Sequence, residues 1–277
     1  MIFTRFHGRT GNQMFQYAAA RALSLDLGTQ VVLDDRLALA RGERSITRIW
    51  DLPVTEAPLP PSRHDRKLAH YLWRYFGSSP KYHREKGLGF DPAFFSLPDD
   101  TYLHGYWQSE MYFGAHADRI RADFAFPAPT GRNAELAAQI GEGLSVSLHV
   151  RRGDYVALST HGVCDQAYYD AALAALLPRL EGEPVIYVFS DEPDWARDHL
   201  ALPGRRVVID HNGEGSDFED MRLMSLCDHH VIANSSFSWW GAWLNASPDK
   251  IVVGPKAWFA NPKLRNPDIL PDSWLTV

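Results

Sequence analysis

Short apolar segments alternate with helical patterns through the second half of the chain, and this alternation constrains the fold more than any other feature. Strand-like apolar runs lie at residues 145–151, 184–189, 206–210, 230–234 and 251–254. The run at 184–189 is apolar almost throughout, which is typical of a strand buried on both faces of a parallel sheet. Strands that are joined by helices form a mostly parallel sheet with right-handed crossovers. The sequence therefore predicts an α/β fold.

The first residues predict a strand, a glycine turn, a helix and a second strand. The strands are expected at 2–6 and 29–34, with Asn12 as the N-cap of the helix and Gly28 near its C-terminal end. A turn with Gly8 and Gly11 before a helix can present backbone N–H groups to an anion. The G-x-G-x-x-G fingerprint is absent, and a purely steric need for glycine is the alternative explanation.

The best candidate linker is the Pro-containing segment 126–131, and 277 residues are enough for two domains. We therefore expect an N-terminal domain at 1–130 and a C-terminal domain at 131–277. The stretch between residues 36 and 100 is less regular. An aromatic group follows it, which is either core or a stacking wall for a sugar. Its members are Tyr106, Trp107, Tyr112 and Phe113.

Composition excludes several classes of protein. The net charge of −6 argues against a general nucleic-acid binder. The only two cysteines, Cys164 and Cys227, predict neither a disulfide framework nor a metal site, and they suit a reducing compartment. No apolar run reaches the roughly 18 residues that span a bilayer, and the first residues lack the apolar core of a signal peptide. We expect a cytoplasmic protein, with peripheral membrane association left open.

Polar side chains follow three of the predicted strands. They are Arg151 with Arg152, Asp191 with Glu192, and Asn234 with Ser235 and Ser236. Parallel strands bring such ends to one edge of a sheet, where open α/β proteins bind ligands. Guanidinium groups match a diphosphate, a carboxylate can accept hydrogen bonds from guanine, and a helix start can bind phosphate oxygens. The simpler alternatives are a surface ion pair and ordinary helix capping.

The two adjacent arginines should point to opposite sides if the strand continues through them. One guanidinium would then face a ligand, and the other would be held by a carboxylate such as Asp154.

Four segments resemble the α-1,2-fucosyltransferase family of bacterial type, glycosyltransferase family 11. They are residues 8–18 (GRTGNQMFQYA), 105–110 (GYWQSE), 149–155 (HVRRGDY) and 225–244, which includes NSSFSWWGAWL. The resemblance implies a GT-B-like architecture, in which two Rossmann-like domains with mostly parallel sheets face a cleft. It implies inverting transfer of L-fucose from GDP-β-L-fucose to the 2-hydroxyl of a terminal galactoside, with no metal and no other cofactor. Arg9-Thr10 departs from the Gly-Leu that is common in bacterial relatives.

The resemblance also implies roles for individual residues. The N-terminal domain would lie on the acceptor side, and the C-terminal domain would bind the GDP-sugar. Arg151 would bind the diphosphate and Asp191 would read guanine, with Glu192 as the competing assignment. Asn12 would reach the diphosphate or the leaving oxygen. The remaining donor-binding residues would be Gly11, His149, Asn234, Ser235, Ser236 and Phe237.

Catalysis would need charge neutralisation at the leaving phosphate and a proton acceptor. No D-x-D motif occurs, so Arg151, Asn12 and helix-end N–H groups are expected to replace a cation. Asp154 is the nearest carboxylate in a motif, although orienting an arginine is the alternative role. The other candidates for the general base are His161, Asp217, Glu219 and Asp220. Another GDP-sugar or protein O-fucosyltransferase, and a non-catalytic GDP-sugar-binding module, are the competing functions.

Overall fold

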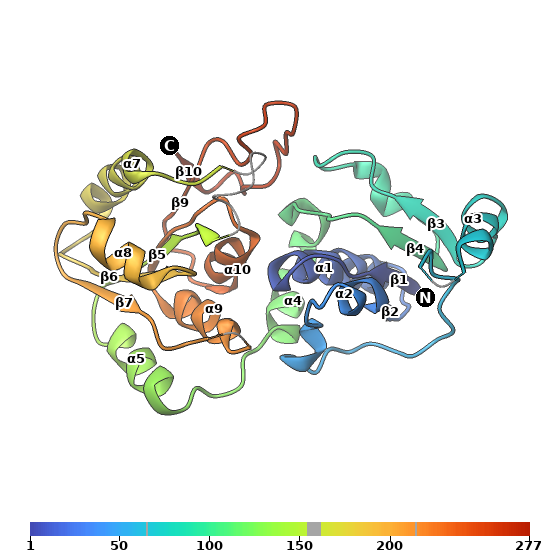
Figure 1. Ribbon diagram of the computed structural model, residues 1–277, viewed down its shortest axis with the longest axis horizontal. Coiled ribbons are helices and arrows are strands. Elements are labelled where there is room, and N and C mark those ends of the chain that lie inside the picture. Colours follow the sequence, from blue (N-terminus) through green and yellow to red (C-terminus); the bar gives the residue numbers. More distant parts are fainter. Residues whose placement is uncertain (65, 154–161, 214) are drawn as a thin grey trace. The chain divides into compact units, whose positions relative to one another are not determined.

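The computed structural model describes residues 1–64, 66–153, 162–213 and 215–277 (Figure 1). The chain forms two compact units. The first contains residues 1–125 and 266–271, and the second contains residues 126–265 and 272–277. The segment 266–271, which the sequence analysis assigned to the C-terminal half, packs with the first unit. Asn266 Nδ2 donates to the carbonyl of Gln108 at 2.9 Å, and Asp268 accepts from the Phe90 N–H at 2.7 Å.

A parallel sheet of order β2-β1-β4-β3 forms the centre of the first unit. Its strands are β1 (Ile2–Arg5), β2 (Val31–Asp34), β3 (Lys81–Arg84) and β4 (Thr101–His104). The helices are α1 (Thr10–Asp26), α2 (Arg36–Ala40), α3 (Lys67–Phe76) and α4 (Ala117–Asp123). Short 3₁₀ turns lie at Ile46–Arg48, Pro92–Ser96, Glu110–Tyr112 and Gly114–His116. The predicted strand–turn–helix–strand start is confirmed.

Helix α1 is buried along most of its length, which its alanine-rich sequence allows by keeping side chains small near the sheet. It ends at Asp26, and Gly28 then turns the chain with a φ of +63°, a conformation that glycine adopts without strain. On another part of the sheet, Trp73 of α3 packs against a buried cluster. The cluster consists of Phe3, Val32 and Tyr102.

The second unit contains a sheet of order β10-β9-β8-β5-β6-β7, in which every pair is parallel. The strands are β5 (Ser145–Val150), β6 (Val185–Ser190), β7 (Arg206–Ile209), β8 (His229–Val231), β9 (Val252–Gly254) and β10 (Leu275–Thr276). The helices are α5 (Gly131–Gly141), α7 (Gln166–Leu176), α8 (Pro193–His199), α9 (Asp217–Leu226) and α10 (Ser236–Leu244). The five predicted strands are confirmed; β10 was missed because two residues carry no periodicity.

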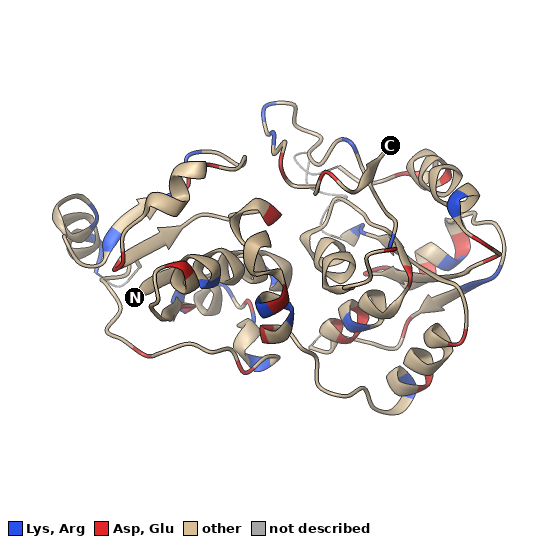
Figure 2. Ribbon diagram, turned by 180° about the vertical axis from the view of Figure 1, so that it is seen from behind, with Lys and Arg blue, Asp and Glu red and all other residues tan. Residues whose placement is uncertain are grey.

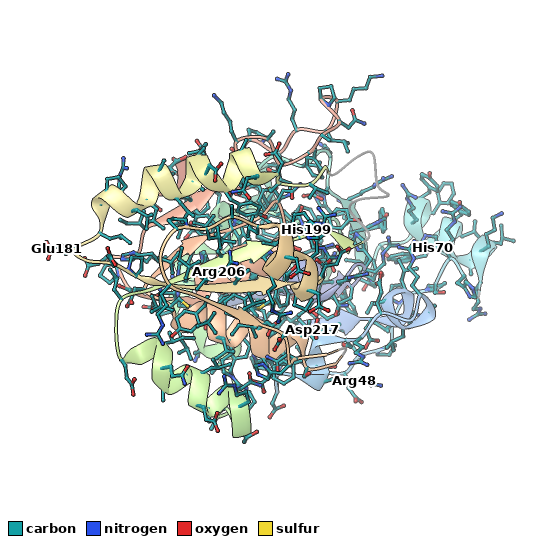
Figure 3. All side chains as sticks on the ribbon, turned by 60° about the vertical axis from the view of Figure 1, so that its left-hand side comes forward. Arg48, His70, Glu181, His199, Arg206 and Asp217 are labelled. Atoms are coloured by element: carbon teal, nitrogen blue, oxygen red, sulfur yellow. The ribbon has the colours of Figure 1, made fainter. Side chains whose placement is uncertain are left out.

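Both faces of this sheet are covered by helices, as the continuous apolar strands predict. Helices α7 and α8 pack on one face with the alternate residues of β5 that include Leu148. Helices α5 and α9 pack on the other face against Tyr187 and Phe189 of β6. Arg206, at the start of β7, donates to the carbonyl of Leu200 just after α8 at 2.7 Å, near the His199 labelled in Figure 3. The long side chain thus satisfies an orphan carbonyl at the helix end.

The strand order places β8, β5 and β6 side by side. Val150 at the end of β5 is in register with Ser190 at the end of β6. Because all three strands run the same way, the polar residues that follow them meet at one edge of the sheet. This is the convergence that the sequence predicted.

Candidate functional site

Asp191 joins the ends of β5 and β6. Its Oδ2 forms an ion pair with Nη1 of Arg151 at 2.9 Å, and its Oδ1 accepts a hydrogen bond from the backbone N–H of Arg152 at 2.9 Å. The Arg151 side chain is 14% exposed. One carboxylate therefore sets the direction of the Arg151 side chain and the path of the backbone after it.

Arg152 has a different set of partners. Its Nε donates to Oε2 of Glu192 at 3.1 Å, and its guanidinium lies over the ring of Trp195, 3.6 Å from the centroid. Asp154, which we expected to hold one of the two arginines, lies outside the described residues. Among the described residues, the carboxylates that hold the two arginines both follow β6, and the role of Asp154 stays a prediction.

Gly153 permits this arrangement. Its φ is +20°, and a Cβ atom placed on it would come within 2.5 Å of Oδ2 of Asp191. Any larger residue would have to displace the carboxylate that holds Arg151. The glycine in the arginine turn is thus a steric requirement of the ion pair.

His149 is buried below this turn. Its side chain is 6% exposed, its Nδ1 lies 2.8 Å from Oγ of Ser238, and its carbonyl accepts from the Tyr169 hydroxyl at 3.0 Å. Burial, with a smaller contribution from the nearby Arg151 charge, lowers the pKa of His149 to about 3. The ring is therefore neutral at physiological pH and cannot attract a phosphate by charge. Its centroid lies 5.9 Å from that of Phe237, and a contact of either ring with the nucleotide stays a prediction.

Helix α10 follows β8 through the short connection 232–235. Ser235 is the N-cap, and its Oγ accepts from the N–H of Phe237 at 3.3 Å. Ser236 opens the first turn. The capping that the sequence analysis offered as the simpler alternative is therefore present, while phosphate binding by these residues stays a prediction.

Asn234 forms hydrogen bonds with two loop residues near this edge of the sheet. The residue is 3% exposed, and its Nδ2 donates to the carbonyls of Gly162 at 3.3 Å and Trp258 at 3.2 Å. These bonds give Asn234 a structural role, and a direct contact with the donor stays a prediction.

Asn12 lies in the first turn of α1, so its expected position as N-cap is wrong. The helix begins at Thr10 because Arg9, the cap residue, is still extended, with φ −72° and ψ 179°. Gly8, with a φ of +81°, lets the chain turn here, and a Cβ on it would lie 2.4 Å from Nδ2 of Asn12. Oδ1 of Asn12 accepts from Nε2 of Gln108 at 2.8 Å.

Two residues that support this turn were missed from the sequence. Oε2 of Glu43 accepts from the Gly8 N–H at 2.9 Å, and Nε2 of Gln13 donates to the Gly8 carbonyl at 2.9 Å. Gln13 also accepts from the N–H of Ile46 at 3.1 Å. Gln13 lies in a motif segment, but no local pattern marks Glu43 as a neighbour of Gly8.

Asp220 has the most perturbed carboxyl group among the proposed bases that the structure describes. Burial raises its pKa to about 7, and the nearby acids Asp217 and Glu219 add to the rise. Nδ2 of Asn212 donates to Oδ1 of Asp220 at 2.7 Å. Glu219 is instead paired with Arg222, and His161 lies outside the described residues. A carboxyl with a pKa near 7 suits proton transfer at neutral pH, so Asp220 stays a candidate base.

We expect Asp220→Asn to stabilise the protein at pH 8 and to have little effect at pH 4. The folded-state pKa of about 7 lies above the unfolded value of about 4, so the folded state binds the proton more tightly. The wild type therefore loses stability as pH rises from 4 to 7, and the asparagine variant does not. We expect a gain of about 1–3 kcal/mol in the free energy of unfolding at pH 8, measured by urea denaturation. An equal effect at both pH values would contradict a raised pKa.

The described residues contain no group of three or more His, Cys, Asp and Glu side chains arranged to hold a metal ion. Over the same residues, no helix is both long and apolar enough to cross a membrane. Basic and acidic residues are mixed in each unit (Figure 2), in keeping with the net charge of −6. An anionic ligand would thus be attracted by local groups such as Arg151.

Comparison with known proteins assigns a family. The model of glycosyltransferase family 11 matches residues 1–277. An α-1,2-colitosyltransferase of Escherichia coli is 32% identical over 299 residues, which cover 100% of this chain and 99% of the relative. A galactoside 2-α-L-fucosyltransferase of Mus musculus is 36% identical over 253 residues, which cover 88% of this chain and 64% of the relative.

Solved structures support the same fold. A mutant of FUT1 from Arabidopsis thaliana, in complex with GDP, aligns with a TM-score of 0.50 at 12% identity. The alignment covers 91% of this chain and 69% of that structure. The two parallel α/β units and this likeness confirm the expected GT-B-like fold class. With a family model that spans its whole length, the chain belongs to glycosyltransferase family 11.

Proposed function

We propose that the protein transfers L-fucose from GDP-β-L-fucose to the 2-hydroxyl of a terminal galactoside, with inversion at the anomeric carbon. The observation that carries the proposal is the Arg151–Asp191 ion pair at the ends of β5 and β6. It presents a guanidinium at the carboxyl edge of a parallel sheet, where α/β proteins bind nucleotides. A galactoside fucosyltransferase among the relatives supports the choice of donor and acceptor.

The reaction is a single displacement. The acceptor oxygen forms a bond to the anomeric carbon, the bond from that carbon to the β-phosphate oxygen breaks, and GDP leaves. The acceptor proton passes to a carboxylate or to solvent. Negative charge grows on the β-phosphate, and Arg151 would stabilise it together with the N–H groups at the start of α10. In this scheme the leaving group needs no metal ion.

Asp191 is a weaker candidate than Glu192 for reading guanine. Both oxygens of Asp191 are engaged by Arg151 and by the Arg152 backbone. Guanine would have to displace one of these bonds. Glu192 is bonded to Arg152 through Oε2, and we assign guanine recognition to Glu192.

GDP-colitose is the second candidate donor, because a colitosyltransferase matches over the whole chain. Colitose is L-fucose without its 3-hydroxyl. A site that hydrogen-bonds a substrate hydroxyl rejects the analogue that lacks it, whereas an apolar pocket discriminates poorly. The preference between the two donors therefore reports whether polar groups of the protein face carbon 3 of the sugar.

The test is a transfer assay with GDP-fucose and GDP-colitose on a panel of β-galactosides, followed by linkage analysis of the products. We expect a 2-linked fucosyl galactoside, higher kcat/KM with GDP-fucose, and an unchanged rate in the presence of EDTA.

A preference for GDP-colitose would replace the donor assignment. Transfer only to a peptide would favour a protein O-fucosyltransferase, and GDP binding without product on any acceptor would favour a non-catalytic module. Loss of activity with EDTA, restored by a divalent ion, would overturn the metal-free scheme.

A further inference from the structure

Helix α3 of the first unit has apolar side chains on two opposite faces. Its inner face is covered: His70, labelled in Figure 3, is 6% exposed, and Trp73 packs on the sheet and donates to the Pro80 carbonyl at 2.9 Å. Its outer face is not covered. The outer side chains are Leu68, Leu72, Tyr75 and Phe76, which are 74%, 53%, 66% and 83% exposed. The i, i+4, i+7, i+8 spacing of these four places them in one stripe.

This stripe differs from ordinary scattered surface apolar residues. The three most exposed large apolar side chains of the described residues are Phe76, Leu68 and Tyr75, all on α3. Single exposed leucines elsewhere need no explanation, whereas a contiguous apolar patch marks an interaction surface.

Basic residues lie on both sides of α3 in the chain. Arg63, Arg66 and Lys67 are exposed at or just before the start of α3, and Lys81 and Arg84 are exposed on β3, which follows it. Residues 63–84 contain six Lys or Arg residues and one acidic residue, Asp65, in a chain with a net charge of −6. The surface around α3 is thus locally basic on an acidic protein.

Three carboxylates lie close to β3 in the sequence or in the sheet: Glu85 directly follows β3, and Asp99 and Asp100 precede its neighbour β4. Glu85 accepts from the N–H groups of Tyr106 at 2.7 Å and Trp107 at 3.0 Å. Asp99 is paired with the amino terminus, and Asp100 accepts from Ser79. These three carboxylates therefore have partners of their own within the first unit.

We propose that α3 binds the surface of an anionic lipid bilayer. The outer stripe enters the boundary between headgroups and acyl chains, and Arg63, Arg66 and Lys67 contact lipid phosphates. A helix with leucine and aromatic residues on one face and basic residues beside it has the composition of an interfacial helix. A second copy of the chain fits less well, because a two-fold contact through α3 would bring the same basic segment against itself. The inference does not depend on the proposed function.

The test is a flotation assay of the full chain with phosphatidylcholine vesicles, with and without phosphatidylglycerol. We expect binding only to the vesicles that contain phosphatidylglycerol, weakened by salt. Leu68→Ser/Leu72→Ser/Phe76→Ser should reduce the bound fraction about tenfold, and Arg63→Gln/Arg66→Gln/Lys67→Gln should remove the preference for anionic lipid. The matched control is Leu39→Ser/Met111→Ser/Leu226→Ser, whose positions are 48%, 54% and 47% exposed and lie off α3. It should bind like the wild type.

All variants should unfold at the wild-type urea midpoint within error and transfer sugar to a soluble galactoside at the wild-type rate, which separates lipid binding from catalysis. Failure of the wild type to float with anionic vesicles would overturn the proposal. So would equal binding by the α3 apolar variant and the matched control. A dimer seen by sedimentation equilibrium and abolished by the α3 apolar variant would assign the stripe to a second copy instead.

Discussion

Arg151→Ala is expected to lower kcat by about 10²–10³-fold, the loss seen when one preorganised donor to a developing negative charge is removed. The guanidinium is held by Asp191 at 2.9 Å, so it needs little reorganisation when charge grows on the leaving phosphate. The same change removes one ion pair from a side chain that is 14% exposed. We expect it to cost about 1–2 kcal/mol of stability, less than a typical total of about 5–15 kcal/mol.

The measurement is kcat with GDP-fucose and a β-galactoside, alongside urea denaturation of each variant. Arg151→Lys keeps the charge but not the planar fork, so its kcat should fall between those of the wild type and Arg151→Ala. Arg132→Ala is the matched control, because Arg132 pairs with Glu135 at 2.8 Å on the exposed surface of the same unit. It should retain wild-type kcat. A folded Arg151→Ala variant with wild-type kcat would remove the basis of the proposed mechanism.

Asp191→Asn is expected to lower kcat by about 10- to 100-fold, because a small misplacement of a catalytic group has effects of this size. Asparagine keeps the shape of aspartate but loses the charge that holds Arg151, and only one of its two terminal atoms can accept a hydrogen bond. Binding of GDP should change little if Asp191 positions Arg151 and does not contact guanine. We would measure kcat by transfer assay and Kd for GDP and IDP by calorimetry.

Glu192→Gln separates the two carboxylates. If Glu192 reads guanine, this variant should bind GDP more weakly and lose most of the preference for GDP over IDP, which lacks the 2-amino group. Asp191→Asn should keep that preference. The opposite pattern, with guanine selectivity lost in Asp191→Asn and kcat retained, would return guanine recognition to Asp191.

Several failures of sequence reasoning at the site have one cause. Asn12 has the chemistry of an N-cap, yet the extended backbone at Arg9 makes Arg9 the cap, so that the helix begins at Thr10. The described carboxylates that hold Arg151 and Arg152 follow another strand, β6. Glu43 bonds the Gly8 N–H from 35 residues away. A local pattern names the type of partner that a group needs but not which distant residue supplies it.

Apolar periodicity and turn residues, which act over a few neighbouring positions, predicted the first strand–turn–helix–strand unit, the parallel sheet of the second half and its polar strand ends. They did not predict β3 in the less regular stretch between residues 36 and 100. Three features follow from the folded arrangement and not from local pattern: Asp191 holds Arg151, burial lowers the pKa of His149, and α3 exposes its outer stripe. Strand register, burial and the covering of a helix face depend on segments far apart in the chain. These are properties of packing, which periodicity along the sequence does not record.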